Sequence, residues 1–134
     1  MTNNDDRWQH LNPYERRYSL SAMQAYDEIM LRTTDVIQIS ERYRLSLEEV
    51  KRAKNFAFGD GVSSYEFSPS PDMADAWLRM SSGKETPLDE VLLRHEIYES
   101  DLVINQGLKQ SDAHKLAQEK YPWSDLLVQS KKDN

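Results

Sequence analysis

Residues 86–107 have the sequence TPLDEVLLRHEIYESDLVINQG and predict the longest helix of the chain. Thr86 supplies an N-cap hydroxyl, Pro87 has the backbone φ that suits the first helical position, and acidic residues follow near the positive end of the helix dipole. Gly107 stands where such a helix needs a left-handed residue in order to end. We therefore expect one long helix over residues 87–106, and we expect it to be the central element of the fold.

The apolar residues of this segment recur at intervals of three and four, which places them on one helical face. His95 and Glu99 fall on the same face, so we expect both polar side chains to turn toward the protein interior. The apolar members of the face are Leu88, Val91, Leu92, Tyr98, Leu102 and Val103.

Helix start signals recur on both sides of this segment. Ser21 with Gln24 and Ser46 with Glu49 each match a capping box, in which two side chains satisfy each other's free backbone amides. Ser70 precedes a proline and an acid, as at the start of the central helix. Further helices are predicted over residues 14–31, 35–44, 47–58, 71–82 and 112–121, with a short one near 125–130.

The fold class that follows is all-α, a single compact multi-helix domain over residues 13–130. Residues 1–12 are predicted to be a flexible arm on which Trp8 could still dock, and residues 131–134 a frayed tail. The longest connection, GDGVSSYEFSP at residues 59–69, has alternating apolar residues that suit either a small strand or an ordered loop.

Charge and composition exclude several classes of function. The 134 residues include 17 basic and 23 acidic ones, so the net charge is −6 and a general nucleic-acid coating function is disfavoured. The absence of cysteine excludes disulfides, thiolate nucleophiles and thiolate metal sites. With no long apolar run and a polar, acidic N-terminus, we expect a soluble, cytoplasmic protein with no membrane partner.

The sequence HEIYE, residues 95–99, places a histidine and a glutamate one helical turn apart. A zinc-protease helix has a second histidine at the position that Glu99 occupies here. His114 is a candidate third ligand, but in a simple antiparallel hairpin it would lie some 12 Å along the axis from His95 and roughly 6 Å from Glu99. We therefore predict no metal and no cofactor. A buried, mutually satisfied pair and a catalytic acid–base pair remain open, with metal the least favoured alternative.

Two further segments are candidate functional sites. Residues 35–58 have the spacing of a helix-turn-helix, with two short helices joined by a turn. Glu48 and Glu49 stand where a recognition helix would meet DNA, so a structural hairpin is the alternative to DNA binding. Lys54 and Asn55 precede two glycines that could form a hinge beside a cleft, or simply end a helix.

A series of short motifs follows the hairpin in a distinctive order. They are Lys54-Asn55 with Phe58, Phe67-Ser68-Pro69, Met73 to Met80 around Trp77, Leu92 to Glu96 with Glu99, Gly107-Leu108, Ala113-His114 and Tyr121. In this motif order the chain resembles a module at the C-terminal end of phage head-morphogenesis proteins and of bacterial polymorphic toxins. The resemblance covers about residues 34–127. Phe56 stands where that pattern has a histidine, a departure that implies a diverged or inactive copy.

The resemblance implies a toxin-type effector with a cognate immunity or partner protein. Its candidate catalytic residues are His95, Glu96, Glu99 and His114, and its candidate substrate-binding residues are Lys54, Asn55 and Trp77. The function we expect is a metal-free, hydrolase-like or nuclease-like reaction. In it His95 would move a proton, Glu99 would fix the histidine tautomer and Lys54 would stabilise negative charge. The alternative is a non-enzymatic adaptor or a DNA-binding regulator acting through residues 35–58.

Overall fold

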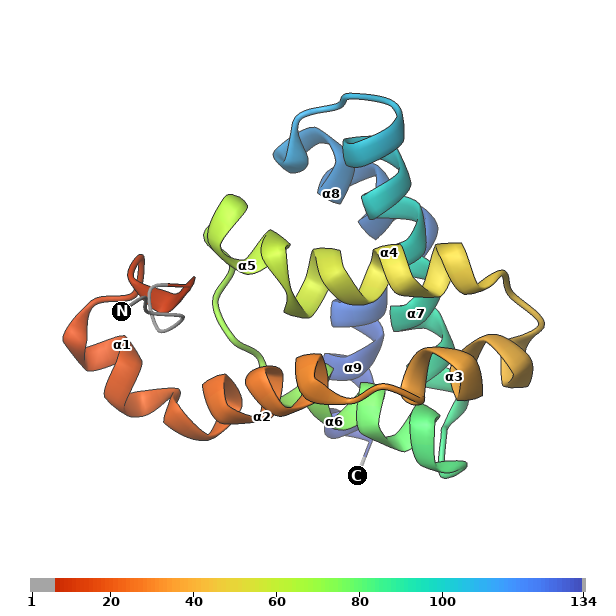
Figure 1. Cartoon of the computed structure of the whole chain (residues 1–134), viewed down its shortest axis with the longest axis horizontal. Helices are drawn as coiled ribbons and strands as arrows, with labels where there is room; N and C mark the ends of the chain where they lie inside the picture. The colour runs from red at the N-terminus through yellow and green to blue at the C-terminus, as the bar shows by residue number, and fades with distance from the viewer. Residues whose placement is uncertain (1–6, 134) are drawn as a thin grey trace.

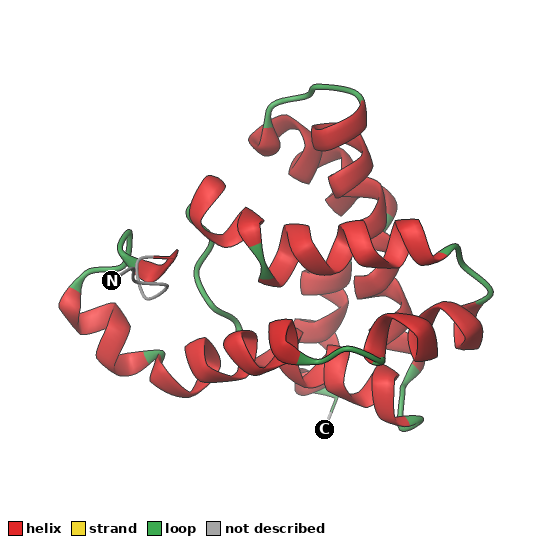
Figure 2. Ribbon diagram, in the orientation of Figure 1, coloured by secondary structure: helices red, strands yellow, loops and turns green. Residues whose placement is uncertain are grey.

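The computed structural model describes residues 7–133, and over that range the chain is all-α and contains no strand (Figures 1 and 2). The predicted fold class is therefore confirmed. The elements are α1 (Pro13–Tyr18), α2 (Leu20–Leu31), α3 (Asp35–Tyr43), α4 (Leu47–Phe58), α5 (Asp60–Ser64), α6 (Pro71–Ser82), α7 (Pro87–Ser100), the π-helical segment η2 (Asp101–Asn105), α8 (Gln110–Lys120) and α9 (Trp123–Lys132).

Most predicted helix starts are confirmed by cap geometry. Ser46 and Thr86 each form a capping box, and the Ser70 hydroxyl accepts a hydrogen bond from the Met73 amide. The prediction of a Ser21 cap is wrong. The chain leaves helical geometry at Ser19, which divides the predicted 14–31 helix into α1 and α2.

The expectation of a strand or loop over residues 59–69 is wrong in its first half, which forms the short helix α5. Gly59 and Gly61 let the chain turn tightly out of α4. A Cβ on Gly61 would lie 1.8 Å from the Phe56 carbonyl oxygen, so the turn requires glycine. The turn buries Val62 completely and returns the chain against the end of α4.

Helix α7 is the central element, since it packs against α4, α6, α8 and α9 (Figure 1). Aromatic rings fill the core beside it. Tyr26 and Phe58 meet edge to face with ring centroids 4.8 Å apart, and Phe58 meets Trp77 at 5.4 Å. Edge-to-face pairs of this kind add stability beyond the area they bury. Trp77 is therefore a core residue, 2% exposed.

The two ends differ from the sequence expectation. Trp8 and Leu11 are buried, and Trp8 Nε1 donates to Asp27 Oδ1, so residues 7–12 are part of the core rather than a loose arm. Residues 1–6 of the expected arm lie outside the described residues. At the other end α9 continues to Lys132, and Lys131 Nζ lies 3.2 Å from Asp72 Oδ2.

Among residues 7–133, no helix combines the length and the apolar character needed to cross a membrane.

Candidate functional site

His95, Glu99 and His114 form one cluster between α7 and α8. His95 Nε2 lies 3.0 Å from Glu99 Oε1, and His114 Nδ1 lies 3.1 Å from the same oxygen. One possible ligand atom from each side chain lies within 4.8 Å of the other two. His95 and Glu99 are buried, whereas the His114 side chain is 53% exposed. The cluster therefore has a buried base and one side that faces solvent.

The expected separation of about 12 Å between His95 and His114 is wrong, because their ring centroids are 5.2 Å apart. The expected pairing of Glu99 with His114 is confirmed. The expected 12 Å was a separation along the helix axis, whereas the side chains of both histidines reach Glu99 from their helices. The α-helix stops at Ser100 and continues as the wider π-helical segment η2, and α8 begins at Gln110, earlier than expected. π-Helical turns are often found at functional sites.

Two neighbouring groups fix the orientation of the cluster. The Tyr121 carbonyl oxygen lies 3.0 Å from His95 Nδ1, and a carbonyl only accepts, so Nδ1 carries a proton. His95 therefore faces oxygen acceptors with both ring nitrogens, which requires a second ring proton or another cation between Nε2 and Glu99. Gln110 Nε2 donates to Glu99 Oε2 at 2.8 Å and holds the other side of the carboxylate.

This environment shifts the pKa values of the two buried groups in opposite directions. Burial works to lower the pKa of His95, but the hydrogen bond to Glu99 and the nearby Glu96 carboxylate outweigh it, so the pKa is raised. Burial works to raise the pKa of Glu99, but hydrogen bonds from His95, Gln110 and His114 outweigh it, so the pKa is lowered. Glu99 is therefore an ionised carboxylate at neutral pH.

A cavity of about 380 Å³ opens beside the cluster. Glu96, Glu99, Gln110 and His114 line one side of it, and Tyr26, Ala57, Tyr65, Glu66, Phe67, Ser68 and Met73 line the rest. Burial raises the pKa of the Glu96 carboxyl to about 8, with a further increase from the Glu99 charge and an opposing effect from His95. Glu96 thus places a titratable group on the cavity wall.

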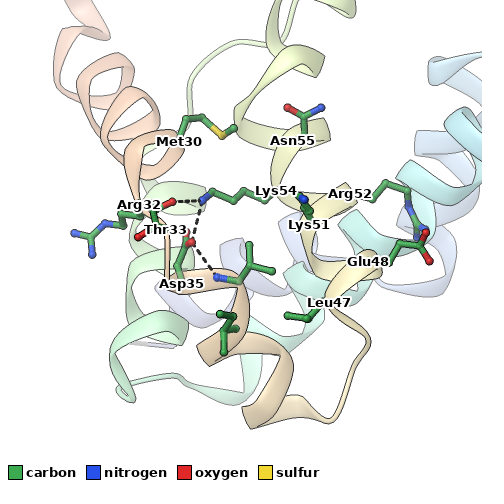
Figure 3. Close-up of a pocket in the computed structure, with 12 residues that line it drawn as sticks. Met30, Arg32, Thr33, Asp35, Leu47, Glu48, Lys51, Arg52, Lys54 and Asn55 are labelled. Atoms are coloured by element: carbon green, nitrogen blue, oxygen red, sulfur yellow. Dashed lines mark hydrogen bonds and ion pairs between the residues drawn. The ribbon is translucent and has the colours of Figure 1, made fainter.

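The three predicted substrate-binding residues lie elsewhere, and this part of the predicted site is wrong. Lys54 extends from α4 toward the α2–α3 connection, where its Nζ donates to Asp35 Oδ1 at 2.9 Å and to the Arg32 carbonyl (Figure 3). Trp77 Nε1 donates to Asp35 Oδ2 at 2.8 Å within the core. Asn55 is exposed and caps the turn at Asp60. Lys54 and Trp77 are therefore structural partners of one buried carboxylate.

The predicted hairpin over residues 35–58 is present as α3 and α4, joined by Arg44 in a left-handed conformation. The guanidinium of Arg52 in this hairpin is hydrogen-bonded within the protein. Its Nε donates to Ser100 Oγ and its Nη2 to the Ile97 carbonyl, both at 3.0 Å. These bonds tie α4 to the last turn of α7, immediately before η2. Arg52 is thus held by the protein itself rather than presented to an external phosphate.

Sequence analysis missed two contributors to the cluster. Gln110 lies in a segment that was expected to be a loop, and nothing in its local pattern identifies it as the partner of Glu99. Tyr121 was named only among the motifs of the resemblance. It contributes its backbone carbonyl, and a backbone contact has no residue-type signature.

Comparisons with protein-family models, with curated proteins and with solved structures gave no significant match to this chain.

Proposed function

We propose that this chain is a small helical effector of the phage- or toxin-associated kind that hydrolyses its substrate in the cavity beside α7 and α8. The observation that carries the proposal is the convergence of Glu96, Glu99 and His114 on one cavity wall, with the buried His95 bonded to Glu99 behind it. Groups able to donate or accept protons, placed together beside a space for substrate, are the arrangement that general acid–base hydrolysis needs.

The wall suggests a role for each group. Glu96 has no hydrogen-bond partner among the described residues and lies beside the space where a water or substrate atom would sit, which suits an acid–base role. His114 is exposed on the same side and can reach a bound substrate. His95 and Glu99 lie beneath them as the buried base of the site. The tautomer of His95 is set by Tyr121 rather than by Glu99.

The charge of the cavity favours one class of substrate. Glu66 and Glu99 line it, and their carboxylates repel a polyanion. We therefore favour a neutral carbonyl compound, such as an amide or an ester, over the phosphodiester of a nucleic acid. A nuclease-like reaction is the less favoured form of the same proposal.

A growth assay tests the proposal. The chain and its variants are expressed in a bacterium, with circular dichroism of each purified protein as the folding control. We expect the unmodified chain to slow growth, Glu96→Gln and His114→Ala to relieve the effect, and His10→Gln to retain it, because His10 lies outside the cluster and contacts the Phe67 carbonyl. Equal growth with all four folded proteins would contradict the hydrolase proposal.

A non-enzymatic adaptor is the second candidate, and a specific surface favours it. A groove of about 660 Å³ lies between the end of α2, α3 and α4 (Figure 3). Ile37 and Leu47 in its wall are 47% and 53% exposed, which is the kind of apolar surface that a partner protein covers. If the chain is an adaptor, Leu47→Glu should change the growth of the bacterium that expresses it, and Glu96→Gln should not.

A further inference from the structure

We propose that His95 Nε2, Glu99 Oε1 and His114 Nδ1 bind a divalent transition-metal ion, for which Zn²⁺ is the best fit. The inference names a cofactor for the cluster described above. The role of the bound ion rests on the proposed hydrolysis. The geometry for ion binding does not depend on that proposal. It also replaces the metal-free form of the reaction expected from the sequence.

The first support is the spacing of the three atoms. Ligands at about 2.1 Å from a zinc ion lie roughly 3.0 to 3.4 Å apart when the angles at the metal are between a right angle and the tetrahedral value. The two separations involving Glu99 Oε1 are 3.0 Å and 3.1 Å, within that interval. One ligand atom from each of the three side chains lies within 4.8 Å of the other two, and the His114 side chain is 53% exposed.

The second support is the chemistry of the donors. Two imidazole nitrogens and one carboxylate form a donor set of catalytic zinc sites, in which three protein ligands leave a further position for water or substrate. Imidazole favours zinc, copper, nickel and iron over magnesium and calcium, which prefer all-oxygen sites. Glu99 offers a carboxylate oxygen to the set, since Oε1 lies next to both histidine nitrogens while Gln110 holds Oε2.

The third support is the second layer of contacts. A metal-binding histidine usually donates its other ring N–H to a carbonyl or carboxylate, which fixes the tautomer and directs the lone pair at the ion. His95 Nδ1 does this with the Tyr121 carbonyl at 3.0 Å. Gln110 does the same for Glu99, since it occupies Oε2 and leaves Oε1 for the ion. The positive charge needed between His95 Nε2 and Glu99 is then supplied by the metal.

The fourth support is the open side of the cluster. The cavity of about 380 Å³ borders Glu99 and His114, so a bound ion would face space for a water molecule or a substrate. Glu96 lines the same space, directly after His95 in the sequence, where it can exchange a proton with such a water. An ion held here would be accessible, as a catalytic one must be.

Calorimetric titration tests the inference on the full chain after treatment with a chelator and its removal. Zn²⁺ is titrated into the unmodified protein at neutral pH, and Co²⁺ is added in a parallel experiment to record the absorption bands that report coordination number. His114→Ala removes an exposed ligand and Glu99→Gln keeps the shape of a buried one. His10→Gln is the matched control, because it removes the chain's third histidine from outside the cluster.

We expect one Zn²⁺ per chain, with Co²⁺ spectra of low coordination number. Loss of a second-layer partner alone weakens metal affinity by roughly tenfold to a hundredfold, so His114→Ala and Glu99→Gln should each weaken it at least tenfold. His10→Gln should leave it unchanged. No binding by the unmodified protein, or equal binding by all four proteins, would overturn the inference.

The metal inference and the hydrolase proposal fail in different ways. Stoichiometric Zn²⁺ binding without any Glu96-dependent effect on growth would refute the hydrolase and leave the metal site standing. A Glu96-dependent effect on growth from a protein that binds no Zn²⁺ would refute the metal site and leave the hydrolase standing.

Discussion

His114 Nδ1 lies 3.1 Å from Glu99 Oε1, across the junction of two helices and fifteen residues away along the chain. The contact joins an exposed histidine to a carboxylate that His95 and Gln110 also hold. One oxygen atom of Glu99 therefore faces two imidazole nitrogens beside an open cavity. The proposed metal site and the proposed reaction both depend on this relationship.

The second layer of the cluster should tune metal affinity without supplying a ligand. Gln110→Ala frees Glu99 Oε2, so the carboxylate loses its fixed orientation, and we expect Zn²⁺ affinity to fall roughly tenfold. Gln106→Ala is the matched control, since that amide donates to Asp101 outside the cluster. Calorimetric titration measures both. Equal affinities for the two variants would show that Gln110 does not orient a ligand.

Zinc affinity should fall as the pH falls. The raised pKa of His95 means that a proton competes with the ion at a higher pH than it would for a free histidine. Glu99, whose pKa is lowered, stays ionised through the same range. Below the pKa of His95 we expect affinity to fall by up to about tenfold per pH unit, because a proton must leave His95 Nε2 before the ion binds. Zinc titrations at several pH values between about 5 and 8 check this, because that range includes the ordinary pKa of histidine at about 6.5. A flat profile would contradict histidine ligation.

Lys54 should stabilise the fold through its buried ion pair with Asp35. Lys54→Met leaves the carboxylate of Asp35 buried with its cation removed, and we expect the free energy of unfolding to fall by about 3 kcal/mol. Lys51→Met, at an exposed position of the same helix, should change it by less than about 0.5 kcal/mol. Urea denaturation measures both. If Lys54→Met unfolds no more easily than Lys51→Met, the buried ion pair does not stabilise the fold.

These residues show which parts of the fold are visible in the sequence. The starts of α4, α6 and α7 were predictable because an N-cap is a local device, made by Ser46, Ser70 and Thr86 within three residues of their partners. The inward position of His95 and Glu99 was predictable for the same reason, since helical periodicity alone places them on the apolar face.

Contacts between helices were less visible. The distance between His95 and His114 depends on η2, and the sequence DLVIN has no recognised signature that distinguishes a π-helical turn from an α-helical one. Lys54 was assigned to the site because it precedes two glycines and belongs to the motifs of the resemblance, whereas Ala57 of the same helix is the residue that lines the cavity. Lys54 and Ala57 are three residues apart on α4, and only the packing of α3 shows that Lys54 meets Asp35.

The N-terminal segment should contribute to stability. Trp8 is 3% exposed and its ring centroid lies 5.7 Å from that of Tyr26, so Trp8→Ala should lower the free energy of unfolding by about 3 kcal/mol or more. Tyr14→Ala, at an exposed position of α1, should have little effect. Thermal or chemical unfolding followed by circular dichroism compares them. Equal stabilities would mean that residues 7–12 behave as the loose arm expected from the sequence.

The most direct measurement of the metal site is anomalous X-ray diffraction from crystals grown with Zn²⁺, with data collected on both sides of the zinc absorption edge. The proposed geometry predicts one peak per chain, about 2.1 Å from His95 Nε2, Glu99 Oε1 and His114 Nδ1. Zinc found only at other side chains, with Glu99 still hydrogen-bonded directly to both histidines, would contradict it.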